Sequence, residues 1–483
     1  MKVQKPIGLY YPLTALLVLV LLSSCTSELQ LGTSDAPKFA LDRSSDVLPY
    51  VQIRSDGPIQ NEPKVGGVIS LYERNALSYT GRLGIEYRGS TSYRLSDKKS
   101  YGIELWDQAD NDLAVELLGM PAEEDWILMG QVFRASTNTI FDTTFLFHRL
   151  GYEIFRSMGN YAARSRFIEL EIDGQYQGLY LLMEKLKRDE NRIAIAELST
   201  ADNSGSALTG GYVFKIDKTS GGGLGEGQPL SYFDNNWDDD ARYSETNSFR
   251  SNYDIHGELL QESPFGPPYH SNQTLETYFV YEYPRPELIT ASQKTYLKKT
   301  IDDFEKALLE GDGSYVDLVD LQSFVDFFLL NELTMNEDAY RLSTFLYKDR
   351  EGPIVLGPVW DLNIGYHRRW GRVPDNDWIA NYNDYVSGDA WMVPFWWDIL
   401  LEDESFIQTL KSRWQSLRTS ALSYAQIEAK IDSDVRLLKE SGAIDRNFQK
   451  WSGIPVNYDA EIAALKSYLN SRLAWMDQEI QKM

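Results

Sequence analysis

Two aspartates in the C-terminal half of the chain stand where they could share one chemical task. Asp338 lies just past a predicted helix, 317–334, and Asp361 lies in a turn just past a predicted hairpin, 343–356. A hairpin between them would bring both carboxylates to the same end of the fold. A general base and a metal ligand suit phosphoryl transfer, because positioning and Mg²⁺ electrostatics do most of the work in that reaction. The alternative is that Asp338 caps a helix and Asp361 fixes a turn, and spacing alone leaves both interpretations open.

Other common catalytic signatures are missing from the sequence. There is no Walker loop, no nucleophile elbow and no zinc-type spacing of Cys and His. The four histidines, His148, His256, His270 and His367, stand at unrelated positions. The sequence therefore argues against a His-dependent triad and against a zinc site.

The elements that must position the two aspartates form two contrasting parts. Residues 49–284 are predicted to be strand-rich, with an acidic, loop-rich insertion at 218–275, and residues 285–483 are predicted to be helix-rich. This order indicates an α+β fold. The strand predictions are 84–88, 101–105, 166–172, 178–184 and 211–217; the helix predictions are 139–158, 288–310, 317–334, 403–418, 423–441 and 457–481.

The N-terminus is typical of a bacterial lipoprotein signal. Lys2 and Lys5 precede a ten-residue apolar run at 13–22, which is too short to span a bilayer, and Leu-Ser-Ser-Cys ends at Cys25. We expect a signal peptide at 1–24, lipidation of Cys25 and a flexible tether at 25–48. The alternative is an ordinary secretory signal. The residue after the cysteine favours the outer membrane, on its periplasmic or cell-surface side, with membrane contact through the lipid anchor only.

Composition limits the partners. The chain has 47 basic and 71 acidic residues, hence a net charge of −24, and this balance argues against nucleic-acid binding. Its single cysteine excludes an intrachain disulfide. The protein partner or substrate cannot be read from composition.

Short motifs spread over about residues 65–480 occur together in a fixed order. They are RGSTS at 88–92, KKSY at 98–101, LGM at 118–120, DWIL at 125–128, DGQYQGLY at 173–180 with EK at 184–185, GGYVFKID at 210–217, NEDAYR at 336–341, PVWDLN at 358–363 and RLAW at 472–475. In this order the motifs resemble those of the CotH kinase family, atypical kinases first known from spore-coat protein H. The specificity comes from the ordered set, because no single motif is specific.

The resemblance implies a divergent protein-kinase-like fold that binds ATP with Mg²⁺ (or Mn²⁺) and phosphorylates protein hydroxyls. Asp338 matches the family's catalytic-loop acid, which would accept the proton of the substrate hydroxyl. Asp361 matches its metal-binding acid, and Asn363 would be the second metal ligand.

The same resemblance implies a phosphate-binding group in the strand-rich part. Lys99, or alternatively Lys98, would hold the α- and β-phosphates, and Glu184 would orient that lysine. Arg88 and the turn at 89–92 would lie near the phosphates, supplying one positive charge and backbone N–H donors.

A second hypothesis is a non-catalytic, cell-surface binding protein on a kinase-like scaffold, for a glycan or a protein. The family often has Asp where this chain has Asn363, and Ser343 stands where ordinary kinases have Asn. Six tryptophans between 360 and 397 could stack on sugar rings, although core packing is the commoner explanation of such a group.

Overall fold

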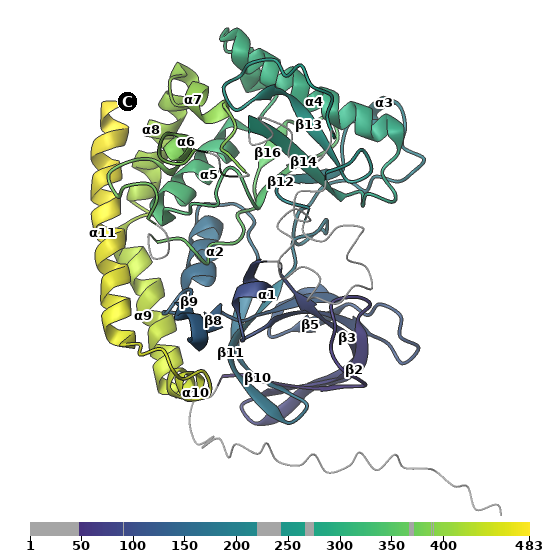
Figure 1. Cartoon of the computed structure of the whole chain (residues 1–483), viewed down its shortest axis with the longest axis vertical. Helices are drawn as coiled ribbons and strands as arrows, with labels where there is room; N and C mark the ends of the chain where they lie inside the picture. The colour runs from purple at the N-terminus through teal and green to yellow at the C-terminus, as the bar shows by residue number, and fades with distance from the viewer. Residues whose placement is uncertain are drawn as a thin grey trace, which may run out of the picture. The chain divides into compact units, whose positions relative to one another are not determined.

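The strand-rich part of the chain closes into a barrel. The computed structural model describes residues 48–89, 91–219, 243–265, 275–366, 371–387, 389 and 391–483. The barrel strands, in spatial order, are β1 (Tyr50–Ser55), β10 (Ser165–Ile172), β11 (Gln175–Glu184), β7 (Asp125–Met129), β4 (Ser100–Trp106), β3 (Ala76–Arg88) and β2 (Val65–Glu73). Only the β1–β10 pair among them is parallel. Figure 1 shows the ring in purple to blue.

Alternation along the strands separates the barrel interior from its outer face. Ile85, Ile103 and Leu128 are buried in the barrel core, which is a hydrophobic cluster separate from the main core of the protein. Between these positions the side chains point outward, because successive residues of a strand face opposite sides. Glu104 of β4 therefore lies outside, paired in register with Asp125 of β7.

The last two strands of a second, five-stranded sheet lie between the two aspartates in the sequence. Its order is β13 (Ser248–Asp254), β14 (Glu276–Tyr283), β12 (Tyr212–Ile216), β15 (Thr344–Lys348) and β16 (Ile354–Leu356). The hairpin predicted at 343–356 is the β15–β16 pair. Short strands β5 (Val115–Leu117), β6 (Met120–Glu123), β8 (Phe133–Arg134) and β9 (Thr139–Ile140) form two separate two-stranded sheets.

Helices dominate the C-terminal part, where polar caps mark their beginnings. The side chains of Thr290, Asp320, Asp403, Ser423 and Asn457 each accept a hydrogen bond from the backbone at the start of a helix. The helices are α4 (Ala291–Glu310), α5 (Leu321–Thr334), α6 (Tyr382–Tyr385), α7 (Trp396–Leu400), α8 (Glu404–Arg418), α9 (Tyr424–Glu440), α10 (Ala443–Lys450) and α11 (Tyr458–Lys482), preceded in the chain by α1 (Thr91–Leu95), α2 (Phe147–Ser157) and α3 (Gly205–Leu208).

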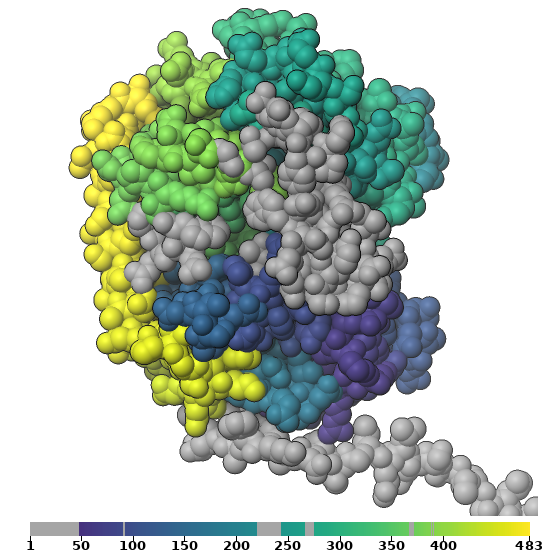
Figure 2. Space-filling model, viewed as in Figure 1, coloured from purple at the N-terminus to yellow at the C-terminus, as the bar shows by residue number. Residues whose placement is uncertain are grey.

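Helix α5 lies at the centre of the helical part. It contacts α2, α8, α11 and strand β16, and its residues from 323 to 334 are all buried. Its apolar residues lie on every face, which favours a place in the core, and its buried acids Asp326 and Glu332 are paired with Arg413 and Arg472. Helix α10 contacts the barrel strand β11. In Figure 2 the yellow C-terminal helices lie alongside both the green helices and the blue barrel residues.

The α+β class predicted from the sequence is confirmed, since the described residues contain both a barrel and a bundle of helices. The helix predicted over 139–158 was too long, because α2 begins only at Phe147. Asp142 and Phe145 have φ of 51° and 65°, which no helix accommodates. The predicted domain boundaries stay predictions. Residues 1–47, with the predicted signal peptide and Cys25, and most of the 218–275 insertion lie outside the described residues. No described helix combines the length and the apolar character that crossing a membrane requires.

Candidate active site

Asp338 lies in the loop that follows α5 and is mostly covered. Its side chain is 17% exposed and accepts an ion-paired hydrogen bond from Arg341 Nη2 at 2.9 Å. Burial raises the pKa of Asp338; the positive charges of Arg341 and Lys218 oppose that rise, and the carboxylate of Asp217 adds to it. The carboxyl thus lies among charges of both signs, with burial as the dominant influence.

The loop that carries Asp338 is held in place through Glu332, which joins the end of α5 to α11. The Glu332 carboxylate, at the end of α5, is fully buried and pairs with Arg472 Nη2 of α11 at 3.1 Å. The same carboxylate accepts hydrogen bonds from the Tyr340 hydroxyl at 2.8 Å and from the backbone N–H of Ile379 at 2.7 Å. Because these donors satisfy the buried charge, the loop has a defined position relative to α5 and α11.

Asp361 follows β16 and lies in the same region. Its backbone has a φ of 52°, in the left-handed region. Burial raises the pKa of Asp361 to about 7; the carboxylates of Asp338 and Asp217 add to this rise, while Arg88 and Lys218 oppose it. The structure therefore brings Asp338 and Asp361 together, as the intervening hairpin predicted. Their chemical roles stay predictions.

A third carboxylate, Asp217, belongs to this region and was missed by the sequence analysis. It directly follows β12 and pairs with Lys215 Nζ at 3.2 Å, while the same Nζ pairs with Glu282 of β14 at 2.7 Å. An acid directly after a buried strand was the signal that singled out Asp361, and the motif GGYVFKID carries the same signal. We call Asp217, Asp338 and Asp361 the aspartate site.

Arg88 is brought to the aspartate site, as expected for a phosphate-binding residue. It ends β3, and its guanidinium carbon lies 5.5 Å from the ring centroid of Trp360, the residue before Asp361. Burial lowers the pKa of Arg88, and the nearby Asp361 carboxylate is the main influence that opposes this. A partly buried guanidinium beside a carboxylate site stays charged and is a suitable partner for a phosphate.

The prediction that Glu184 orients Lys99 is wrong. Glu184 is fully buried, and its carboxylate pairs with Arg164 at 2.7 Å and with Arg192 at 3.4 Å. Lys99 Nζ donates to the Tyr93 carbonyl at 2.8 Å instead. The register explains the difference: Glu184 lies opposite the beginning of β7, whereas the start of β4, next to Lys99, lies opposite its end.

The alternative lysine, Lys98, is buried and fully hydrogen-bonded within the protein. It is 1% exposed, and its ammonium donates to Gln131 at 2.5 Å, to the Leu179 carbonyl at 2.6 Å and to Asn447 of α10 at 2.8 Å. Burial holds the pKa of Lys98 well below its usual range. These three hydrogen bonds connect the barrel to α10. Lys98 therefore has a structural role in holding these two elements together.

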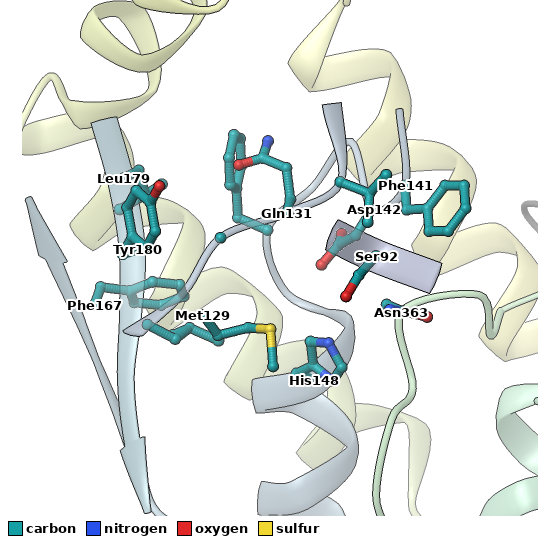
Figure 3. Close-up of a pocket in the computed structure, with 14 residues that line it drawn as sticks. Ser92, Met129, Gln131, Phe141, Asp142, His148, Phe167, Leu179, Tyr180 and Asn363 are labelled. Carbon is teal, nitrogen blue, oxygen red and sulfur yellow. The ribbon is translucent and has the colours of Figure 1, made fainter. Parts of the chain in front are cut away.

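Asn363, the predicted second metal ligand, lines a small cavity. Ser92 and His148 line it as well, and Figure 3 shows the Asn363 amide facing the Ser92 hydroxyl. The cavity holds about 30 Å³, enough for one or two water molecules. Asn363 therefore contributes to this cavity wall, and its role as a metal ligand stays a prediction.

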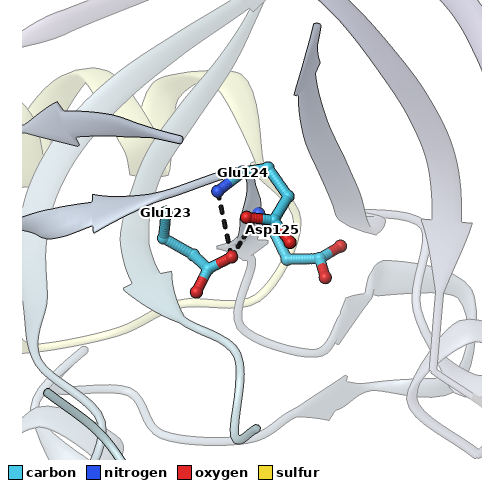
Figure 4. Close-up of side chains that lie close together, drawn as sticks. All are labelled: Glu123, Glu124 and Asp125. Atoms are coloured by element: carbon cyan, nitrogen blue, oxygen red, sulfur yellow. Dashed lines mark hydrogen bonds between the residues drawn. The ribbon is translucent and has the colours of Figure 1, made fainter. Parts of the chain in front are cut away.

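A second group of acids, Glu123, Glu124 and Asp125, lies at the barrel (Figure 4). We call them the barrel acids. Within the described ranges they are the one group of three acids, histidines or cysteines whose ligand atoms all lie within 4.8 Å of one another. Lys187 Nζ contacts the three carboxylates at 2.8, 2.6 and 3.3 Å, and Arg192 contacts Glu123 at 3.2 Å. The place a metal ion would take is thus taken by an ammonium group.

The tryptophans between 360 and 397 are mostly core residues. Trp378, Trp391, Trp396 and Trp397 are buried, and Trp360 is partly buried; Trp370 lies outside the described residues. Core packing, one of the two explanations considered for them, is therefore confirmed for four of the six.

Comparison with known protein families identifies a model that matches most of the chain. The family model described as CotH kinase protein matches residues 85–476, which include the aspartate site and Arg88. No curated protein matches the chain.

Proposed function

Because the chain belongs to the CotH kinase family, we propose that it is an ATP-dependent kinase with a divergent kinase-like fold. In this proposal it transfers phosphate to Ser or Thr hydroxyls of a protein outside the cytoplasm. The observation that carries the proposal is the aspartate site: three carboxylates from three different segments share one partly buried region next to Arg88. Asp338 is paired with Arg341 and Asp217 with Lys215, whereas Asp361 forms no ion pair with any described residue. An acid left in this way suits chemistry that brings its own cation.

The residues at the site fit a divalent metal ion. Carboxylate oxygens are the ligands that Mg²⁺ and Mn²⁺ prefer, and burial together with the neighbouring acids raises the pKa of Asp361 to about 7. A bound cation would relieve that repulsion. Asp361 and Asp217 would hold the ion, which supplies charge neutralisation at the transferring phosphate. The three acids are less tightly grouped than the barrel acids. Such spacing is compatible with two roles in one site, with Asp338 as the base and the other two aspartates as metal ligands.

The protein's own groups then divide the work. Asp338 accepts the proton of the substrate hydroxyl, and its ion pair with Arg341 at 2.9 Å keeps the carboxylate oriented. Arg88 and Lys218, both close to Asp361, hold the phosphates in line for attack. The Lys215–Glu282 pair fixes the end of β12 and with it Asp217.

The direct test is a calorimetric titration of ATP into the full chain, with and without Mg²⁺. We expect binding that tightens with the metal and that weakens at least tenfold in Asp361→Asn. Asp445→Asn, a change of an exposed acid on α10, is the matched control and should bind as the wild type does. A full chain that binds no nucleotide under any of these conditions would remove the proposal.

The non-catalytic binding protein remains the second candidate, supported by Asn363. This neutral residue lines the small cavity with Ser92 and His148. Its other support is weakened, because the buried tryptophans offer no stacking surface. Nucleotide binding without transfer of label from γ-labelled ATP to any protein acceptor would favour this candidate.

We also propose that Cys25 carries a lipid anchor. The support is the sequence pattern alone, namely the positive start, the apolar run at 13–22 and the single cysteine of the chain. Metabolic labelling with a radioactive fatty acid should mark the wild type and leave Cys25→Ala unlabelled. Labelling of both proteins would contradict the assignment.

A further inference from the structure

The segment that carries Asp361 packs against helix α2. Gly151 of α2 lies so close to it that a Cβ at this position would stand 2.1 Å from Leu362 Cδ1. At the start of α2, the Phe147 carbonyl accepts a hydrogen bond from the Tyr366 hydroxyl at 3.2 Å, and the two rings lie 4.5 Å apart. The conformation of this segment therefore depends on α2 as well as on the strand before it.

Asp361 needs such support because its backbone is in the left-handed region, which residues with a side chain rarely adopt. Two side chains of α2 bind the backbone at this point. Tyr152 Oη accepts a hydrogen bond from the N–H of Asp361 at 3.3 Å, and His148 Nδ1 accepts one from the N–H of Leu362, also at 3.3 Å. His148 and Tyr152 are four positions apart, so both project from the same face of the helix.

The pair is enclosed and has defined protonation. His148 is 6% exposed and Tyr152 is fully buried, and their Nδ1 and Oη atoms lie 3.2 Å apart. An Nδ1 that accepts from a backbone N–H has no proton, so the neutral ring carries its proton on Nε2. Burial, followed by the charge of Arg88, lowers the pKa of His148 to about 4, in agreement with a neutral ring.

The contact extends from Tyr152 to the phosphate side of the site. The rings of Tyr152 and Trp360 are stacked, 5.8 Å apart with 14° between their planes. Trp360 in turn faces the Arg88 guanidinium. One tyrosine of α2 therefore contacts the backbone of the metal-binding candidate and the aromatic ring that supports the arginine.

We infer that His148 and Tyr152 are positioning residues that hold the Asp361–Leu362 backbone in its left-handed turn and so set the affinity of the aspartate site for a divalent cation. The inference rests on the proposed function, since it concerns the metal that Asp361 would bind. It assigns a task to α2, an element that the sequence analysis connected with no chemistry.

Binding of Mn²⁺ to the full chain, followed by electron paramagnetic resonance, tests the inference without any transfer reaction. We expect Tyr152→Phe, which keeps the ring and removes the hydroxyl, to weaken Mn²⁺ binding about tenfold. Tyr315→Phe is the matched control, because it also removes the hydroxyl of a buried tyrosine. That hydroxyl donates to Asp403 at 2.5 Å and does not contact either proposed metal ligand, Asp217 or Asp361. The control should bind Mn²⁺ as the wild type does.

Substitutions of His148 separate positioning from packing. His148→Asn keeps an acceptor near the place of Nδ1 and should retain most of the Mn²⁺ affinity, whereas His148→Leu should lose it. Hydrogen exchange of the peptide around 359–366 should speed up in Tyr152→Phe and in His148→Leu, but not in the control.

The outcomes distinguish two failures. If the wild type binds Mn²⁺ and Tyr152→Phe binds it equally well, or if Tyr315→Phe loses as much affinity, the positioning role is overturned while the proposed function stands. If the wild type binds neither Mn²⁺ nor ATP, the proposed function falls and the inference falls with it.

Discussion

The protein gathers acids in two places, and they are built in opposite ways. The barrel acids lie within 4.8 Å of one another, and Lys187 contacts all three. The aspartate site is looser, its members come from three distant segments, and Asp361 forms no ion pair with any described residue. The barrel acids are thus neutralised by a lysine of the protein itself, whereas Asp361 in the aspartate site has no such ion-paired partner among the described residues.

The difference shows that proximity alone is a poor guide to a metal site. Lys187 responds to the barrel acids: burial lowers its pKa, but the hydrogen bonds to Glu123 and Glu124 and the charge of Asp125 outweigh this and raise it. At Asp361, burial and like charges together raise the pKa to about 7. The better indicator of a cation-binding site is therefore the charge that remains uncompensated after the protein's own partners are counted.

The largest expected effect is on catalysis at the aspartate site. Asp338→Asn removes the proposed base and should lower kcat for phosphate transfer by about 10²–10⁴-fold. The equivalent change among the barrel acids, Glu124→Gln, should leave kcat within about twofold of the wild type. A kinase assay with γ-labelled ATP compares the two. Equal losses in both variants would erase the functional distinction between the two groups.

A second substitution, at Lys187, should make the barrel acids resemble the aspartate site by removing their cation. Lys187→Met keeps most of the side-chain length and removes the cation, so the barrel acids are left with uncompensated charge. We expect the free energy of unfolding to fall by about 2–3 kcal/mol, measured by urea denaturation. Millimolar Mg²⁺ or Ca²⁺ should stabilise the variant more than it stabilises the wild type, in which Lys187 already neutralises the barrel acids. Equal stabilisation of the two proteins by either ion would show that these acids cannot hold a metal even when their lysine is removed.

A third, smaller effect is stabilisation of the wild type by metal. At ten to thirty times Kd, Mg²⁺ should raise the free energy of unfolding by about 1–2 kcal/mol. The thermal midpoint should rise accordingly in the wild type and stay constant in Asp361→Asn. Asp445→Asn serves again as the control and should respond like the wild type. A response that survives in Asp361→Asn would place the metal elsewhere.

The smallest effect concerns acid sensitivity of the barrel acids. Burial opposes ionisation of Glu124, but the hydrogen bonds with Glu123 and Lys187 outweigh it and lower the pKa to about 2. A carboxyl with a lowered pKa stabilises the fold above about pH 4.5, and this stability is lost as the pH falls toward 2. Between pH 5 and pH 3 the wild type should lose about 1 kcal/mol more than Glu124→Gln, after allowance for solvent screening. Identical pH profiles in urea denaturation would contradict this.

The sequence predicted the neighbourhood of Asp338 and Asp361 because that prediction needed only local information. An apolar helix, a hairpin and two acids at their ends are visible in 317–361, and the helix and hairpin are present in the structure as α5 and the β15–β16 pair. The position of Arg88 beside Asp361 followed from the family resemblance, which places the two motifs in one site.

The partners of Glu184 could not be predicted in the same way. Whether it meets a lysine or an arginine depends on the barrel register, which places it opposite Trp126 and close to Arg164 and Arg192. The contribution of α2 was equally hidden, because His148 and Tyr152 act through hydrogen bonds to backbone groups more than 200 positions away. Such contacts leave no periodic trace in the sequence.

The pairing of Glu332 with Arg472 has a consequence for the order in which the protein matures. The arginine comes 140 positions after its partner and close to the end of the chain. During synthesis, the segment around Asp338 leaves the ribosome long before the residue that locks it exists. A chain that ends before position 472 lacks the arginine that pairs with Glu332, so this contact around the Asp338 loop can form only after the middle of α11 has been made.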